Sequence, residues 1–182
     1  MNAMTAENLR SAFGGESQAH MRYRIWADKA EKDGFKNVAN LFRAVSYAEE
    51  VHATNHFRAL KDEAGDFSVT SGAGFGLSTT SENLEAARNG ELHEIEQMYP
   101  AFMAVAEKQE EKAAINSMKF AIEAEKTHAE LYKKAKEAVD ADKDYETEKI
   151  YVCPVCGYTV EGEAPDKCPI CLVKAERFVE FK

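Results

Sequence analysis

Apolar residues recur at steps of three and four over the first 140 positions, which is the spacing of a helix that buries one face. The pattern predicts helices over residues 5–32, 35–64, 81–107 and 111–139. Asp33-Gly34 and a charged hairpin at 107–111 separate the two helices of each pair. We expect Ser81 to cap the third helix, and Pro100 to kink it because proline lacks an amide hydrogen.

Residues 65–80 interrupt the helical pattern with a run rich in Gly, Ser and Thr. In extended form such a segment spans roughly 53 Å, whereas a helix of about 28 residues is about 42 Å long. The segment can therefore cross the full length of a bundle and leave the helices on either side of it parallel. Ferritin-like four-helix bundles have one such crossover, between their second and third helices. We expect this mainly α-helical fold for residues 1–140.

Glutamate and histidine residues lie in the middle of the apolar faces, where an unpaired charge is costly. The first and third helices each carry one such glutamate, and the second and fourth each carry a Glu-x-x-His pair on one face. The residues are Glu16, Glu49, His52, Glu91, Glu125 and His128. The glutamates are placed similarly about the two hairpins, so all four should meet at one level. This is the ligand plan of bundles that bind two metal ions, and oxygen and imidazole ligands suit iron or manganese.

Glu94 adds a fifth carboxylate, one turn after Glu91. Two divalent cations would neutralise most of the charge of the five carboxylates, which would otherwise repel one another. We expect ferric iron, the harder ion, to prefer Glu94, and ferrous iron to move towards His52. The alternative is that Glu94 lies outside the ligand set or at the surface.

Four other residues face inward near this level. Tyr23 and Tyr99 can donate hydrogen bonds to ligand carboxylates, or can simply pack in the core with a satisfied hydroxyl. For His20 and His56 we expect packing or hydrogen bonding rather than a role as metal ligands.

Residues 141–149 are charged and have no apolar face, which indicates a linker, and residues 150–182 form a small second domain. This domain holds all four cysteines, in two Cys-x-x-Cys pairs: Cys153, Cys156, Cys168 and Cys171. Two such pairs make a tetrahedral four-sulfur metal site, and so short a unit depends on the metal to fold. The spacing allows iron or zinc. Nearby aromatic residues favour an iron that transfers electrons.

Together these motifs resemble those of the rubrerythrins over essentially the whole chain. They are Gly15-Glu16-Ser17-Gln18-Ala19, Glu49-x-x-His52, Gly90-Glu91-Leu92-His93-Glu94 with Met98-Tyr99-Pro100, Glu125-x-x-His128, and the cysteines of a rubredoxin-like domain. The resemblance implies a non-haem di-iron peroxidase that reduces hydrogen peroxide to water. Electrons would pass through the C-terminal four-cysteine iron from a redox donor such as a rubredoxin or an NAD(P)H-dependent reductase.

The resemblance also implies a role for each site residue. Glu49 and Glu125 would bridge two irons, with Glu16 bound to one iron, Glu91 and His128 bound to the other, Glu94 and His52 exchanging as ligands, and Tyr23 and Tyr99 beside them. One departure is Leu172, because many rubredoxin-like sites have glycine after the last cysteine. This change can alter backbone hydrogen bonding to the sulfur without threatening iron binding.

Composition excludes several classes of protein. A net charge of −9 argues against nucleic acid as a partner. No apolar run reaches membrane-spanning length and the N-terminus lacks a signal-peptide core, so we expect a cytoplasmic protein without a membrane partner. Two other functions stay open: a ferroxidase or iron-handling ferritin-like protein, and a scaffold whose C-terminal unit is a zinc ribbon.

The linker also bears on assembly. Glu125 lies roughly 21 Å along its helix from the start of the linker. We expect the short linker to bring the small domain back over only part of this distance. A head-to-tail homodimer, with the rubredoxin-like domain of one chain beside the bundle of the other, would solve the problem.

Overall fold

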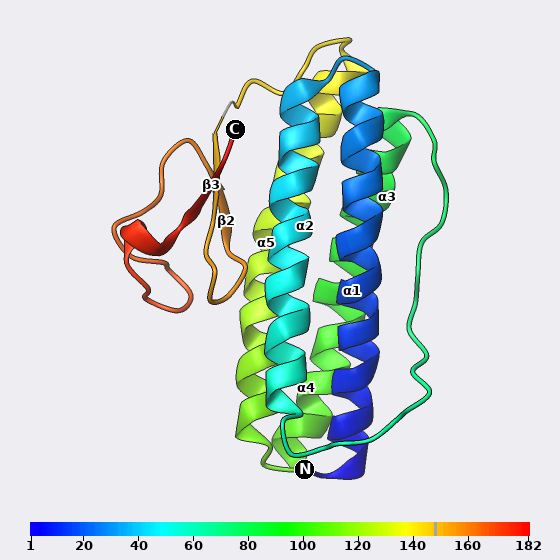
Figure 1. Ribbon diagram of the computed structural model, residues 1–182, viewed down its shortest axis with the longest axis vertical. Coiled ribbons are helices and arrows are strands. Elements are labelled where there is room, and N and C mark those ends of the chain that lie inside the picture. The colour runs from blue at the N-terminus through cyan, green and yellow to red at the C-terminus, as the bar shows by residue number, and fades with distance from the viewer. Residues whose placement is uncertain (148) are drawn as a thin grey trace.

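The computed structural model describes residues 1–147 and 149–182, and in this part of the chain four helical rods lie side by side (Figure 1). The helical elements are α1 (Ala3–Lys32), α2 (Lys36–Ala59), α3 (Thr80–His93), the π-helix η1 (Glu94–Met98), α4 (Tyr99–Lys108) and α5 (Lys112–Asp140). Because α3, η1 and α4 follow one another without a gap, they form one rod. The structure thus confirms the ferritin-like four-helix bundle.

Two helix boundaries differ from the expected ones. The cap of α3 is Thr79 rather than Ser81, because the Thr79 hydroxyl accepts from the Glu82 amide while the Glu82 carboxylate accepts from the Thr79 amide. The α2 helix ends at Ala59, before the expected end at 64. Where the sequence predicted a kink, a π-helical turn immediately precedes α4. Pro100 lies in the first turn of α4, where its missing amide costs little.

The segment between α2 and α3 runs along the outside of the bundle from one end to the other (Figure 1). Three side chains of α1 hold this segment by donating hydrogen bonds of 2.9 to 3.0 Å to its backbone carbonyl oxygens. Ser11 donates to Thr70, Gln18 to Gly74 and Trp26 to Gly76. A Cβ at Gly14 would lie 3.1 Å from Ser71 Cβ, so glycine allows the close approach. The long crossover is therefore confirmed.

Two apolar clusters fill the bundle, one on each side of the level of the inward glutamates. One contains a group of packed aromatic rings, Tyr23, Trp26, Phe42 and Tyr132. The other is built around Leu9, Tyr99 and Met118. The carboxylates are thus enclosed along the bundle axis by apolar side chains.

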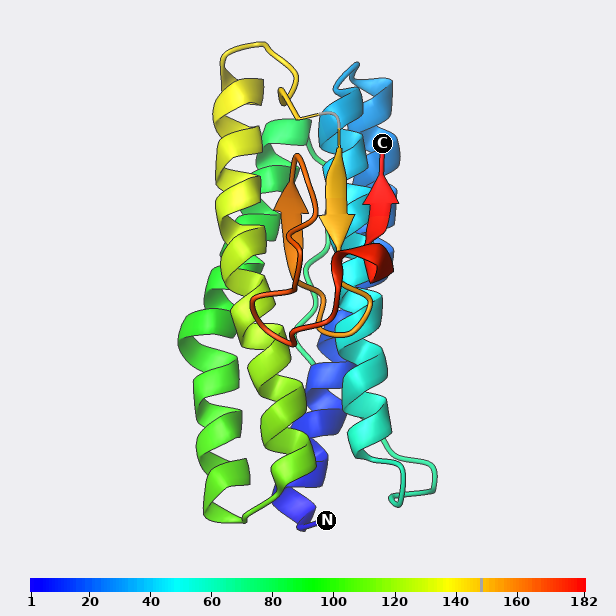
Figure 2. The same ribbon diagram turned by 90° about the vertical axis from the view of Figure 1, so that its left-hand side faces the viewer.

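The C-terminal part is a small antiparallel sheet that lies against α2 and α5 (Figure 2). Its strands are β1 (Ile150–Val152), β2 (Thr159–Glu161) and β3 (Val179–Phe181), in the order β2-β1-β3. Ile150 and Val152 are fully buried in the same cluster as the bundle aromatics. No helix in the described residues is long and apolar enough to cross a membrane.

Candidate di-metal and four-cysteine centres

Four helices bring their acidic and imidazole groups together as predicted. Ligand atoms within 4.8 Å of one another form two groups, Glu16–Glu49–His52–Glu125 and Glu49–Glu91–Glu125–His128. Every residue in both groups is buried. The two groups share Glu49 and Glu125, so the arrangement offers two neighbouring cation positions with two carboxylates common to both.

One oxygen of each of these four carboxylates makes no hydrogen bond of good geometry among the described residues, although His52 Nδ1 lies 2.8 Å from Glu125 Oε1. These buried atoms are Glu16 Oε2, Glu49 Oε1, Glu91 Oε2 and Glu125 Oε1. Leaving four such oxygens unpaired in an apolar interior would be costly, whereas metal ions would satisfy all of them. The donor set therefore fits a pair of metal ions.

The two histidines present their Nδ1 atoms to the carboxylates. His52 Nδ1 lies 2.8 Å from Glu125 Oε1, and His128 Nδ1 lies 2.8 Å from Glu125 Oε2. Their Nε2 atoms face the C-terminal sheet, where His52 is 3.2 Å from the Cys156 carbonyl oxygen and His128 is 2.9 Å from Thr159 Oγ1. A proton on Nε2 that is donated to the sheet leaves Nδ1 free for a metal ion.

Burial and charge divide the carboxylates into two kinds. Burial, followed by repulsion from neighbouring carboxylates, raises the pKa of Glu49 and Glu125 well above the usual value. For Glu91 the effect of burial is outweighed by hydrogen bonds from Glu125 and His128, and its pKa falls to about 2. For Glu16, burial is outweighed by the nearby imidazoles, and its pKa is lowered. In the metal-free site the two shared glutamates therefore hold protons more readily than Glu16 and Glu91 do.

Tyr23 and Tyr99 each donate to a carboxylate of the candidate ligand groups, which is one of the two alternatives that the sequence left open. The Tyr23 hydroxyl donates to Glu91 Oε1 over 2.6 Å, and the Tyr99 hydroxyl donates to Glu16 Oε1. In both cases the second oxygen of the glutamate is the unpaired one. Each tyrosine therefore fixes which oxygen of its glutamate remains available.

Glu94 is half-buried and belongs to neither group of ligand atoms. It lines a cavity of about 460 Å³ together with Gln18, Arg22 and Gln97. Burial and the charges of Glu16 and Glu91 raise its pKa well above the usual value. His52, its predicted exchange partner, is already beside the shared carboxylates.

The two further histidines that were expected to face inward, His20 and His56, differ in their surroundings. His20 is half-buried, and its Nδ1 lies 2.8 Å from the Ser46 carbonyl oxygen, away from the ligand groups. His56 is fully buried and lies 2.9 Å from the Tyr99 hydroxyl, so it is part of the site's surroundings. Its spacing of four residues after His52 places it on the same helix face, a signal that the sequence contained.

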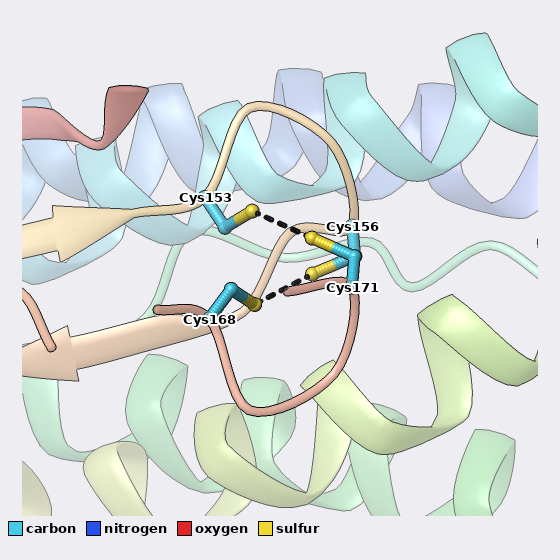
Figure 3. Close-up of side chains that lie close together, drawn as sticks. All are labelled: Cys153, Cys156, Cys168 and Cys171. Carbon is cyan, nitrogen blue, oxygen red and sulfur yellow. Dashed lines mark hydrogen bonds between the residues drawn. The ribbon is translucent and has the colours of Figure 1, made fainter. Parts of the chain in front are cut away.

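The four cysteine side chains converge at one end of the sheet (Figure 3). Their sulfur atoms lie within 4.8 Å of one another, all four thiols are free, and the Sγ atoms of Cys153 and Cys171 are 3.4 Å apart. A hydrogen bond from Cys156 lowers the pKa of Cys153 to about 5, which favours the thiolate that binds metals. The geometry matches a tetrahedral four-sulfur site.

The two cysteine loops have the same backbone form. In the first, Gly157 has a φ of 81° and its amide donates to the Cys153 carbonyl. In the second, Leu172 has a φ of 64° and its amide donates to the Cys168 carbonyl. Leucine thus occupies a left-handed position usual for glycine, and the backbone hydrogen bond is kept.

Comparison with known proteins agrees with this geometry. The family model described as Rubrerythrin matches residues 7–136, and the model of the rubrerythrin rubredoxin-like domain matches residues 151–179. Rubrerythrin-2 of Clostridium acetobutylicum is 50% identical over 180 residues, covering 99% of this chain and 98% of the relative. The chain belongs to the rubrerythrin family. Rubrerythrins bind iron, and here the buried carboxylate–histidine layer fits two irons and the four cysteines fit a third.

Similarity in structure extends over the same length. A structure titled as the fully reduced, all-ferrous state of nigerythrin gives a TM-score of 0.87 at 33% identity, covering 99% of this chain and 88% of that one. A humanized archaeal ferritin gives a TM-score of 0.63 at 14% identity over 78% of this chain and 86% of that one, which concerns the fold alone. The curated nigerythrin of Nitratidesulfovibrio vulgaris is 33% identical over 97% of this chain and 86% of its own length.

The rubredoxin-like part of this rubrerythrin chain lies beside His52 and His128 of its own bundle. This corrects the expectation that the linker returns the small domain over only part of the distance to Glu125. The small domain contacts the bundle through residues 156 and 157, so the stretch that covers the distance is 141–157 rather than the linker alone. At about 3.3 Å per extended residue, such a stretch can span more than the roughly 21 Å required. Asp144 holds its start by accepting from the Asn37 and Val38 amides at the N-terminus of α2.

Proposed function

We propose that the chain is a non-haem di-iron peroxidase that reduces hydrogen peroxide to water with electrons delivered through the four-cysteine iron. The observation that supports this most is the pair of ligand groups sharing Glu49 and Glu125, with the outer nitrogens of both histidines facing the four-cysteine unit. Each peroxide consumes two electrons and two protons and yields two water molecules. Two irons at this site would supply the two electrons for cleavage of the O–O bond.

We assign the ligands by the atoms that converge. Glu49 and Glu125, which belong to both groups, would bridge the irons. Glu16 and His52 would complete one position, and Glu91 and His128 the other. The cavity at Glu94 gives small molecules an approach from the side of the crossover, and Glu94 itself, with its raised pKa, can carry a proton there.

The contact between the bundle and the rubredoxin-like part supports a short electron path. Cys156 is one of the four cysteines, and its carbonyl oxygen lies 3.2 Å from His52 Nε2. Electrons would cross this hydrogen bond from the four-cysteine iron to the bundle. We further propose a cytoplasmic location and a rubredoxin or an NAD(P)H-dependent reductase as the donor. A head-to-tail homodimer stays a prediction, although this path does not require one.

The test is anaerobic reduction of the iron-loaded chain followed by stopped-flow mixing with hydrogen peroxide. We expect rapid oxidation of the bundle and, with excess reductant, repeated turnover. A Cys168→Ser chain is the matched control, because it should oxidise once and then stop. A ferroxidase would instead respond to oxygen and fail to turn over peroxide. A zinc ribbon would show no colour that bleaches on reduction.

A further inference from the structure

His56 is a fully buried histidine that the proposed ligand set does not use. It lies on α2 and contacts two other rods of the bundle. Its Nε2 is 2.9 Å from the Tyr99 hydroxyl of α4, and its Nδ1 is 2.8 Å from the Ser117 hydroxyl of α5. Ser117 and Tyr99 are buried too, so the three polar groups depend on one another for hydrogen bonds.

The direction of these hydrogen bonds follows from Glu16. A carboxylate that binds a metal ion is ionised and can only accept, so the Tyr99 hydroxyl must donate to it. The phenol oxygen then accepts from His56, which places the imidazole proton on Nε2. Nδ1 of His56 is left as an acceptor for the Ser117 hydroxyl. All donors therefore run in one direction, from Ser117 through His56 and Tyr99 to Glu16.

The two tyrosines of the site are held in different ways. Tyr23, which donates to Glu91, packs its ring edge-on against Tyr132 at a centroid distance of 5.5 Å and also lies against Trp26 and Phe42. The Tyr99 ring lies 5.8 Å from the His56 ring, and its hydroxyl lies within hydrogen-bond distance of His56 Nε2. Both tyrosine rings are packed among buried side chains, but the Tyr99 hydroxyl has in addition an imidazole partner that orients it.

We infer that His56, supported by Ser117, is a positioning residue that holds the Tyr99 hydroxyl on Glu16 Oε1 and so keeps Glu16 Oε2 directed at one metal position. A phenol that accepts a hydrogen bond is also a stronger donor, so His56 strengthens the contact that it positions. The effect is confined to the metal position that includes Glu16, because Glu91 at the other position accepts from Tyr23 instead. This inference rests on the proposed role of Glu16 as an iron ligand.

Anaerobic titration of the full chain with Fe²⁺ tests the inference without any use of peroxide. Groups that orient metal ligands typically contribute about 10- to 100-fold in affinity. We expect Tyr99→Phe to weaken one of the two bundle irons within that range. His56→Leu should weaken the same iron by a smaller factor and leave the other unchanged. His56→Gln keeps an amide donor on a similar side chain and should restore much of the loss.

His20→Leu is the matched control, because it removes a histidine that joins α1 to α2 without contacting a ligand. It should leave both irons bound as in the unmodified chain. If His56→Leu binds both irons normally, weakens both equally, or behaves as His20→Leu does, the positioning role is wrong. Glu16→Ala separates the two hypotheses: if it too keeps both irons, the proposed ligand set fails; if it loses one while His56→Leu loses nothing, only the present inference fails.

A second readout reports the hydrogen-bond direction itself. The ¹⁵N resonances of the histidines in a zinc-loaded chain distinguish protonated from bare ring nitrogens, and His56→Leu identifies the signal that belongs to His56. We expect the proton on Nε2 and a bare Nδ1. A proton on Nδ1 would reverse the chain of donors and overturn the inference.

Discussion

Single carboxylates decide how the bundle responds to metal and to pH. Burial raises the pKa of Glu49 and of Glu125 in the metal-free chain, and neighbouring carboxylates raise it further: Glu91 and Glu16 act on both, and Glu49 acts on Glu125. A raised pKa in the folded state gives stability that is complete below the usual pKa and is lost as the pH rises through the folded value. The pKa of His52 is lowered by burial to about 4, so His52 costs stability as the pH falls below its usual value of 6.5.

From these shifts we predict that the stabilisation given by metal grows with pH. The unfolding temperature of the metal-free chain should fall as the pH rises above the usual glutamate pKa of 4.5 towards the raised folded values, because Glu49 and Glu125 ionise freely in the unfolded chain but only at a cost in the buried site without a cation. The metal-loaded chain should change less, since bound metal favours the ionised carboxylates. Thermal unfolding of both forms across pH measures the difference. A metal-free chain with both Glu49→Gln and Glu125→Gln is the control, and its unfolding temperature should not decline in this way as the pH rises. A difference between the unfolding temperatures of the metal-free and metal-loaded chains that stays constant with pH would contradict the prediction.

A second prediction at this scale concerns Glu125, which faces both metal positions. Replacing Glu125 with Ala should remove one shared carboxylate and leave the remaining charges poorly neutralised. We expect the bundle to hold fewer than two irons and to lose peroxide turnover. Metal analysis after anaerobic loading checks the first part. Glu123→Ala on the solvent side of the same helix, where the side chain pairs with Lys126, should bind iron normally. A Glu125→Ala chain with two irons and normal turnover would show that the ligand assignment is wrong.

At the scale of elements, the first cysteine loop and α2 approach each other closely at Gly157. A Cβ at this position would lie 2.1 Å from His52 Nε2, in addition to the strain of a φ of 81°. Gly162 has a similar φ of 85° but open space around it. Alanine at either glycine costs about 1–2 kcal/mol in backbone strain, yet only one substitution pushes the two parts of the protein apart.

We therefore predict that Gly157→Ala slows electron transfer from the four-cysteine iron to the bundle. Both irons of the bundle and the four-cysteine iron should still bind, because no ligand is removed. Stopped-flow re-reduction of the peroxide-oxidised bundle measures the rate, with Gly162→Ala as the strain-matched control. Equal rates in the two variants would mean that the contact at His52 is not the electron path.

The π-helical turn η1 begins at Glu94, and it bears on the predicted ligand exchange. A π turn inserts an extra residue into a helix and commonly occurs at functional sites. We predict that Glu94 binds one iron in the oxidised state and that His52 replaces it on reduction, because lower metal charge weakens the preference for oxygen anions. Crystal structures of both states provide the measurement. Identical coordination in the two would remove any role for Glu94 as a ligand.

At the scale of the whole molecule, the rubredoxin-like part contacts the bundle of its own chain through Asn55, His52 and His128. One chain therefore brings its two candidate metal sites into contact, as the proposed electron path requires. A mixture of Glu125→Ala and Cys168→Ser chains tests whether this route is used. Each variant lacks one centre, so we predict that mixed assemblies stay inactive.

The same mixture would regain turnover if rubredoxin-like parts were exchanged between chains, since one intact centre of each kind would then meet. Such recovery would support electron transfer across a head-to-tail dimer. Mixing unmodified chains with Cys168→Ser chains is the control, because activity there should fall only in proportion to dilution.

The amino-acid sequence by itself determined the bundle, its crossover and most of the glutamate, histidine and cysteine residues that converge in the candidate metal sites. Helical period and the distance of a residue from a hairpin are local quantities, so they place Glu16, Glu49, Glu91 and Glu125 at one level without knowledge of packing. The Cys-x-x-Cys spacing likewise fixes a four-sulfur site within a short loop. The cap at Thr79 could also have been predicted from the sequence, since Thr79 and Glu82 have capping-box spacing.

Only the tertiary structure decided how these parts meet. The contact between His52 and Cys156 joins residues 104 positions apart, and the contact between His56 and Ser117 joins residues 61 positions apart. No periodicity encodes such pairs, because they depend on how rods and sheet pack in three dimensions. For the same reason the length of the linker was not enough to predict where the small domain lies. The direction in which the chain turns back is set by contacts such as that of Asp144 with the start of α2.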